Sequence, residues 1–269
     1  MNQLLDPEAM MTSALLGPDI CVEFFGLPGS GKSTIARAAH ASLSKIDPDM
    51  AFSPALLRDG AGVSVRVAAK LRLILAEIFG NRAILDLTRK VLVTPQPSLR
   101  DRLRTTFTVA TVAALYSSRR RHRQGAVLDQ GLLQAIWSVQ LRRPIANGGD
   151  LVSDMIKSAA QSRRIYVLVE TPAEICAKRL VTRGPKHSRM QTGEGTRDLH
   201  NWEKAELLRR TILSDFRAAC RLSGDLPHIV VIDGMADPAL SAAQIVTAFT
   251  QYRLLQVYHD NMQNQGLKL

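Results

Sequence analysis

A glycine-rich octapeptide near the N-terminus has the residue types and spacing that bind phosphate groups. It reads Gly-Leu-Pro-Gly-Ser-Gly-Lys-Ser over residues 26–33 and matches the pattern G-x-x-x-x-G-K-[ST]. Its glycines let the backbone turn N–H groups inward toward an anion, and the following helix N-terminus adds positive potential. Lys32 reaches the β- and γ-phosphates of a nucleotide in such a loop, and the Ser33 hydroxyl can ligate Mg²⁺. The motif predicts ATP and Mg²⁺ as cofactors, held by Gly26, Pro28, Gly29, Ser30, Gly31, Lys32, Ser33 and Thr34.

The segments on either side of the octapeptide fit the strand and the helix that such a loop requires. Residues 20–26 form a short apolar run rich in Ile, Val and Phe, and residues 32–44 carry apolar side chains at helical spacing. A chance match to the pattern in a chain of this length has odds of about one per cent before this context is counted. A phosphate-binding loop is therefore favoured over a bare glycine turn.

Short apolar runs alternate with helical patterns along the rest of the chain. Strands are expected at residues 50–54, 126–129, 165–170 and 228–232, besides the first one. Between them, helices are expected over 63–93 with a break near residues 80–81, then over 99–123, 132–139, 151–161, 171–183, 197–222 and 238–254. A turn separates the helices around residues 144–150, and Thr171 is expected to cap the helix that follows it. The alternation predicts an α/β fold in three layers, with a parallel sheet of about five strands.

The same pattern divides the chain into one domain with two additions. Residues 1–18 are read as an N-terminal leader, residues 19–256 as the domain, and residues 257–269 as a polar tail. Within the domain, residues 53–123 are read as a helical insertion. Residues 184–196 mix glycines with basic side chains and have no periodicity, which is typical of a mobile surface loop.

Composition and charge narrow the function classes. The 269 residues are 46% hydrophobic and 22% charged, which excludes disorder for most of the chain. The longest apolar run, about 12 residues, is too short for a membrane span. A formal charge of +11 favours polyanionic partners, including nucleotides. Three cysteines without metal-ligand spacing indicate neither a disulfide framework nor a zinc site, and a cytoplasmic setting fits best.

One carboxylate follows a strand in a position to serve the phosphate site. Asp129 comes directly after the apolar run of residues 126–128. It is a candidate Mg²⁺ ligand or general base that orients an attacking hydroxyl. The alternative is that Asp129 only caps the following helix.

Four segments together resemble the thymidylate kinase-like and nucleoside kinase-like group of P-loop kinases. They are the octapeptide and residues 127–131, 178–189 and 230–238, and the resemblance covers about half of the chain. It implies a phosphotransferase in which Asp129 faces the phosphates and Mg²⁺. Gln130 departs from the group's pattern, because that group usually has arginine there, so its contact with the acceptor is open.

The resemblance also implies that the insertion at residues 53–123 lies on the acceptor side and that residues 184–196 form a lid loop, and it assigns roles around the nucleotide. Arg183 and Arg189 correspond to lid arginines that close over the γ-phosphate, where countercharge stabilises the transferring group. Arg179 is expected to pack against the adenine, and the backbone at Gly234 is expected to border it. The alternative for these arginines is a solvated helix end.

The acceptor side carries the least information. Twelve arginines lie between Arg58 and Arg123, and most are read as solvated helix faces. One or two are expected to turn into the cleft and hold an acidic or phosphorylated acceptor, and Arg58 is the favoured one because it follows the second strand. Gln134 and Trp137 are candidate acceptor contacts, although core packing is the alternative for the tryptophan.

Several function classes remain open at this stage. The acceptor is most simply a nucleoside or nucleotide, with a sugar, an antibiotic or another metabolite as alternatives. A nucleotide-dependent regulatory protein with little turnover is the rival class. The chain has no Asn-Lys-x-Asp stretch and no strand ending in Asp-Glu, which speaks against GTPases and AAA+ ATPases. Nucleic acid is a less favoured partner, because the basic run at 119–123 is brief and lacks aromatic residues. A homodimer stays open.

Overall fold

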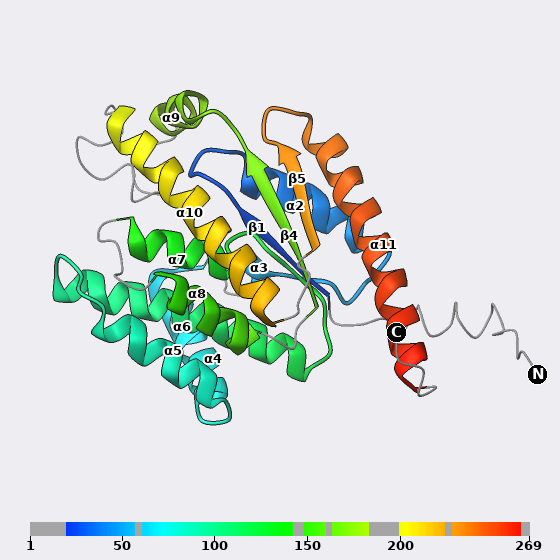
Figure 1. Cartoon of the computed structure of the whole chain (residues 1–269), viewed down its shortest axis with the longest axis horizontal. Helices are drawn as coiled ribbons and strands as arrows, with labels where there is room; N and C mark the ends of the chain where they lie inside the picture. The colour runs from blue at the N-terminus through cyan, green and yellow to red at the C-terminus, as the bar shows by residue number, and fades with distance from the viewer. Residues whose placement is uncertain are drawn as a thin grey trace, which may run out of the picture.

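A five-stranded parallel sheet separates two layers of helices in the computed structural model of the chain (Figure 1). The structure describes residues 20–56, 61–141, 148–159, 163–182, 199–223 and 228–264. The strand order is β2-β3-β1-β4-β5, and every neighbouring pair is parallel. The strands are β1 (Ile20–Phe25), β2 (Ala51–Phe52), β3 (Ala126–Leu128), β4 (Arg163–Glu170) and β5 (His228–Asp233). The predicted α/β class with a parallel sheet is confirmed.

Different helices cover the two faces of the sheet (Figure 1). One face packs against α2 (Lys32–Leu43) and α11 (Pro238–Asn264). The other face packs against α6 (Leu99–Arg121), α7 (Leu132–Gln140), α8 (Gly148–Ala159) and α10 (Leu199–Ser223). The remaining helices are α3 (Ser53–Leu56), α4 (Val63–Ile78), α5 (Arg82–Val93) and α9 (Ala173–Thr182).

The central strand shows why the sheet needs both layers. Alternate side chains of a strand point to opposite faces. Ile20, Val22 and Phe24 join the core shared with α2 and α11, whereas Cys21 and Phe25 join the core on the other face. Because every residue of β1 is buried, the strand reads as a continuous apolar run, with one charged exception at Glu23.

The second strand and the turn before α8 differ from their predicted bounds. The second strand is limited to Ala51–Phe52, and α3 begins at Ser53, because Pro54 has a fixed φ and no N–H and so suits the first turn of a helix. The predicted turn at residues 144–150 ends earlier than expected, since α8 already begins at Gly148.

The C-terminal helix is also longer than predicted. It continues to Asn264, so residues 257–264 are helical rather than part of a tail. Residues 239–264 contain no proline or glycine that would end the helix. Val257 is only 7% exposed, so an apolar contact supports the additional turns. The predicted leader at 1–18 and the lid loop at 184–196 lie outside the described residues.

Two further observations bear on the expectations from composition. Within the described part of the chain, no helix combines the length and the hydropathy that a membrane span needs. The three cysteines, Cys21, Cys176 and Cys220, all lie in described segments, are buried and form no disulfide.

Candidate functional site

The glycine-rich loop between β1 and α2 has the backbone conformation that its sequence predicts. Gly29 and Gly31 have φ values of 83° and 97°, a region that side chains disfavour. A Cβ atom on Gly29 would also lie 2.6 Å from the carbonyl oxygen of Cys176 in α9. The loop therefore depends on glycine at these positions for conformation and for close packing against α9.

Two side chains of the loop are held in place to meet a ligand. The Lys32 ammonium donates hydrogen bonds to the carbonyl oxygens of Gly26 and Leu27, each 2.7 Å long, and this side chain is 8% exposed. The hydroxyl of Ser30 is buried and has no hydrogen-bond partner among the described residues. An orphaned hydroxyl in a glycine-rich loop fits a loop that binds an anion.

A cavity of about 790 Å³ opens over this loop and joins it to helices far away in the sequence. The loop wall contains six predicted nucleotide contacts, from Pro28 to Thr34, and Arg179 and Gly234 lie beside them. The opposite wall comes from α6, from α7 and from the segment that leads into α7. Its residues are Arg104, Thr108, Val112, Gln130, Gly131, Gln134, Ala135, Trp137 and Ser138.

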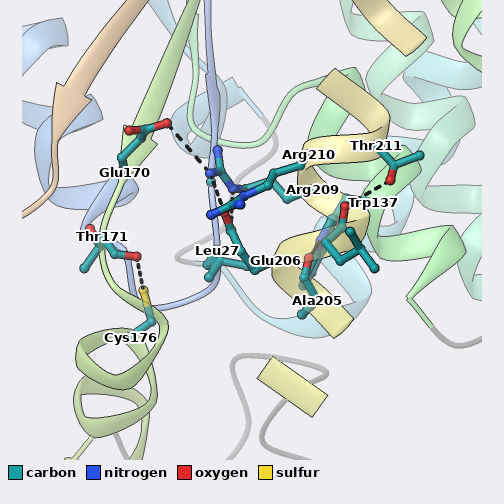
Figure 2. A network of polar contacts seen from close by, with 12 residues as sticks. Leu27, Trp137, Glu170, Thr171, Cys176, Ala205, Glu206, Arg209, Arg210 and Thr211 are labelled. Atoms are coloured by element: carbon teal, nitrogen blue, oxygen red, sulfur yellow. Dashed lines mark hydrogen bonds and ion pairs between the residues drawn. The ribbon is translucent and has the colours of Figure 1, made fainter. Parts of the chain in front are cut away.

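The structure brings most of the predicted site residues to this cavity. Gln130, Gln134 and Trp137 line it, as expected for candidate acceptor contacts. Gln134 also ties the two walls together, because its side-chain oxygen accepts a hydrogen bond from the Gly26 N–H at 3.4 Å. Trp137 is 3% exposed and donates its indole N–H to the carbonyl oxygen of Ala205 in α10 at 2.9 Å (Figure 2). Its ring is thus both core and cavity wall.

Arg179 connects the loop to the far edge of the sheet. Its guanidinium donates to the carbonyl oxygen of Gly234 at 3.0 Å and lies 3.5 Å from that of Gly29. A Cβ on Gly234 would be 2.3 Å from the Ser30 carbonyl oxygen, so the segment between β5 and α11 contacts the loop closely. The expected nucleotide-side location of both residues agrees with these contacts.

Thr171 has a different role from the predicted one. Its hydroxyl donates to the carbonyl oxygen of Ser30 at 3.0 Å instead of capping α9. The first helical bonds of α9 run from Ile175 and Cys176 to the carbonyl of Pro172. The Thr171 side chain, which follows β4, therefore supports the phosphate loop, which follows the neighbouring strand β1.

Asp129 lies where β3 ends beside the phosphate loop. In the parallel pairing of β1 with β3, Leu128 lies opposite Glu23, so Asp129 lies next to Phe24. Phe24 is two residues before the phosphate loop begins at Gly26. The Asp129 N–H donates to the hydroxyl of Ser53 at 3.3 Å. Asp129 is half-buried and is not part of the cavity lining.

Ser33 and Asp129 are the two predicted Mg²⁺ ligands, and of these only Ser33 lines the cavity. Both side chains offer the oxygen ligands that this ion prefers. Within the described residues, no group of three or more His, Cys, Asp or Glu side chains could hold a metal ion. Mg²⁺ typically binds one or two protein oxygens together with substrate phosphates, so a sparse donor set is compatible with it.

The sequence analysis missed a buried carboxylate behind the acceptor wall. Glu23 is fully buried, accepts the N–H of Leu133 at 2.8 Å and accepts the hydroxyl of Tyr116. Burial raises the pKa of Glu23, while the bonds from Tyr116 and Leu133 and the charge of Arg164 act in the opposite direction. The only signal in the sequence is a glutamate inside an otherwise apolar strand.

The Glu23 carboxylate substitutes for a missing helix cap. The residue that precedes α7, Gly131, provides no side-chain cap. A Cβ on Gly131 would lie 2.0 Å from the carboxyl carbon of Glu23, so only glycine lets the carboxylate approach the helix N-terminus. An anion there is favourable for the helix dipole. Glu23 thus anchors the element that supplies much of the acceptor wall.

An ion-pair network fixes α10 to the end of β4 (Figure 2). Arg209 is 7% exposed and binds Glu206 through two hydrogen bonds of 2.7 and 2.8 Å. It also lies 3.8 Å from Glu170, the last residue of β4. Burial acts to raise the pKa of Glu206, but the bonds from Arg209 and Arg210 outweigh it and lower the pKa. This network holds the helix that fixes Trp137.

Other predicted residues cannot be placed, and some cavity residues were not predicted. Arg58, Arg183 and Arg189 lie outside the described residues. On α6, the cavity is lined by Arg104, Thr108 and Val112, whose four-residue spacing puts them on one helix face. That spacing was visible in the sequence, but nothing in it indicated which face of α6 meets the cavity.

The basic run near residues 119–123 forms the end of α6, as expected. Arg119, Arg120 and Arg121 lie in its last turn. Arg121 pairs with Glu77 at 2.6 Å, and Arg119 donates to Gln124 at 2.6 Å. Two of these arginines therefore have intramolecular partners.

Comparison with known proteins identifies a family. A model described as an AAA domain matches residues 22–199, more than half of the chain. The match begins in β1 and includes the phosphate loop. No curated protein is similar enough in sequence to count as a relative.

Three solved structures of deoxyadenosine kinase from M. mycoides are similar to this chain. The first contains the products dCMP and a flexible dCDP, the second contains dCTP, and the third contains dATP. In the same order, the sequence identities are 12%, 13% and 13%, and the TM-scores are 0.46, 0.45 and 0.46. Each alignment covers 86% of this chain and 99%, 99% and 98% of the kinase chains.

The family match confirms the sequence interpretation of a P-loop NTPase with an α/β fold. The finer assignment to the nucleoside and nucleotide kinase-like group stays a prediction. The description of the matching family names an AAA domain, and none of the comparisons tests the expectation against AAA+ ATPases. The absence of a strand that ends in Asp-Glu bears on how a water molecule would be activated for ATP hydrolysis. It does not bear on the phosphate loop itself.

Proposed function

The chain belongs to the AAA domain family of P-loop NTPases, and we propose that it is an ATP- and Mg²⁺-dependent phosphotransferase acting on a small-molecule acceptor. The observation that carries the proposal is the cavity that extends from the phosphate loop to α6 and α7. An ATP hydrolase needs only room for a water molecule beside the γ-phosphate. A second wall of polar side chains instead suits a second substrate.

The reaction transfers the γ-phosphoryl group in one step. An oxygen of the acceptor forms a bond with the γ-phosphorus while the bond from that phosphorus to the β–γ bridging oxygen breaks. ADP leaves with the bridging oxygen. The proton of an acceptor hydroxyl passes to the Asp129 carboxylate where Asp129 acts as general base, and to solvent where Asp129 acts as a Mg²⁺ ligand instead. Positioning and countercharge contribute most of the catalysis in such transfers.

The roles of the loop residues follow from this chemistry. Backbone N–H groups of the loop hold the phosphates, and Lys32 exchanges its contacts with the carbonyls of Gly26 and Leu27 for phosphate oxygens. Ser33 and Asp129 would hold Mg²⁺, which neutralises developing negative charge on the phosphates when bound. Arg179 and Gly234 would border the adenine, on the side where they already contact the loop.

Finer parts of the proposal rest on the sequence resemblance. We assign Arg183 and Arg189 to a lid over the γ-phosphate, and Arg58 to the acceptor side. The acceptor is a nucleoside or nucleotide, with Gln130, Gln134 and Trp137 among its contacts, and the domain comprises residues 19–256. Three cysteines without a disulfide support a cytoplasmic location.

Transfer of a labelled phosphoryl group tests the proposal directly. The purified protein is incubated with γ-labelled ATP and Mg²⁺ against nucleosides, nucleoside monophosphates, sugars, sugar phosphates and aminoglycosides. Label that appears in one acceptor class supports the phosphotransferase. Tight ATP binding without transfer to any acceptor contradicts it and favours the regulatory alternative.

A further inference from the structure

The walls of the cavity have a one-sided charge distribution. Among its described lining residues, three are cationic, Lys32, Arg104 and Arg179, and none is a carboxylate. A cavity with this lining favours anions and disfavours cations. ATP accounts for part of that preference, so the position of each cation decides whether it serves the nucleotide.

Two of the three cations belong to the nucleotide side. Lys32 contacts the carbonyl oxygens of Gly26 and Leu27. Arg179 contacts the carbonyl oxygen of Gly234, in the segment after β5. Both guanidinium and ammonium groups are therefore held against the loop that binds the triphosphate.

Arg104 lies on the other wall. It shares one face of α6 with Thr108 and Val112, a stripe that extends about 12 Å along the helix at a rise of 1.5 Å per residue. Its side chain is exposed and forms no ion pair with any described carboxylate. The guanidinium is thus available to a ligand in the cavity.

The polar side chains that share this wall with Arg104 are neutral. Gln130 from the segment before α7, and Gln134 and Ser138 from α7 itself, contribute amide and hydroxyl groups. Such groups orient a substrate by hydrogen bonding without neutralising a charge. The formal charge of this wall therefore comes from Arg104 alone, within the described residues.

We propose that Arg104 forms an anion subsite at the acceptor end of the cavity, and that the acceptor is a small molecule that already carries a phosphate or carboxylate group. This inference rests on the proposed phosphotransferase function and narrows its acceptor. The planar guanidinium binds either group through paired hydrogen bonds. Cationic acceptors such as aminoglycosides are disfavoured, because the described residues that line this wall include no carboxylate to receive them.

Binding measurements separate this subsite from the phosphate loop. The loop is first saturated with Mg²⁺ and an ATP analogue whose β–γ bond cannot be cleaved. Matched pairs are then titrated by calorimetry: a nucleoside and its 5′-monophosphate, a sugar and its phosphate, and a sugar and the corresponding sugar acid. At least one anionic member is expected to bind about tenfold more tightly than its neutral parent. The phosphate and acid pairs show which anion the subsite prefers.

Variants on one helix test the residue itself. Arg104→Gln is expected to remove the preference for the anionic member and to leave the affinity for the ATP analogue within about twofold. Arg100→Gln is the matched control, because Arg100 is exposed on α6 and does not line the cavity. The control should bind both ligands like the unmodified protein.

The outcomes distinguish failure of the subsite from failure of the phosphotransferase. Transfer of label to a neutral or cationic acceptor, with no anionic acceptor used, overturns the subsite and keeps the phosphotransferase. Anion binding lost in Arg104→Gln, without label transfer in any mixture, supports the subsite and overturns the phosphotransferase. Equal affinities for all matched pairs, or loss of ATP-analogue binding in Arg104→Gln, overturn the subsite.

Discussion

The carboxylate of Glu23 accepts a hydrogen bond from the backbone N–H of Leu133 at 2.8 Å, across 110 residues of sequence. Glu23 lies three residues before the phosphate loop, and Leu133 lies in the first turn of α7. Tyr116 of α6 donates its hydroxyl to the same carboxylate. One buried side chain thus links the strand that leads to the phosphate loop with both helices of the acceptor wall.

The Glu23→Gln variant is expected to change how stability depends on pH. Burial raises the pKa of Glu23 from 4.5, so the folded chain binds this proton more tightly than the unfolded chain does. The stability that comes from protonated Glu23 is fully present at pH values below its pKa in the unfolded chain. It is lost as the pH rises through the raised pKa of Glu23 in the folded chain. The free energy of unfolding, measured by urea denaturation, should therefore fall with rising pH more steeply in the unmodified protein than in Glu23→Gln.

An exposed glutamate provides the control for that comparison. Glu174 is exposed on α9, so Glu174→Gln is the control for a Glu→Gln substitution at a surface position. Parallel profiles for the unmodified protein and Glu23→Gln would show that the Glu23 carboxyl does not titrate differently in the folded state.

The Gly131→Ala variant should be destabilised by steric overlap with Glu23. The added Cβ would lie 2.0 Å from the carboxyl carbon, and the expected cost is about 1–3 kcal/mol of unfolding free energy. Gly62→Ala is the matched control, since a Cβ there has no neighbour within 4 Å. In a Glu23→Ala background the Gly131→Ala cost should shrink, and an unchanged cost would locate the strain elsewhere.

Replacement of Lys32 should remove phosphoryl transfer without unfolding the chain. Lys32→Ala deletes the countercharge for the transferring group, and the rate should fall by about 100-fold or more. The measurement is label transfer from γ-labelled ATP, with circular dichroism to verify the fold. Lys45→Ala, at an exposed position after α2, serves as the control. Transfer that survives in Lys32→Ala would contradict the mechanism.

Replacement of Asp129 should separate catalysis from nucleotide binding. If the carboxylate orients Mg²⁺ or the acceptor, Asp129→Asn lowers kcat by about 100-fold or more and changes ATP affinity little. Steady-state kinetics and calorimetry measure the two quantities, with the exposed Asp86→Asn as control. Equal losses in kcat and affinity would indicate a structural aspartate instead.

The amino-acid sequence by itself determined the phosphate loop, the alternation of strands and helices, and the strand end at Asp129. These features are local: a loop pattern, a helical or extended periodicity and the residues that follow it lie within a few positions of one another. Errors occurred where local signals compete, as at Ser53 and Pro54, where a predicted strand is the start of α3.

Only the tertiary structure decided which face of α6 meets the cavity and what Glu23 binds. Arg104 is one of twelve arginines in its region, and no local pattern distinguishes it from the others. Glu23 reads as an anomaly in an apolar strand until its partner on α7 is known. Both results depend on packing between segments far apart in the chain, because a side chain's partners are set by which elements meet and not by its neighbours in sequence.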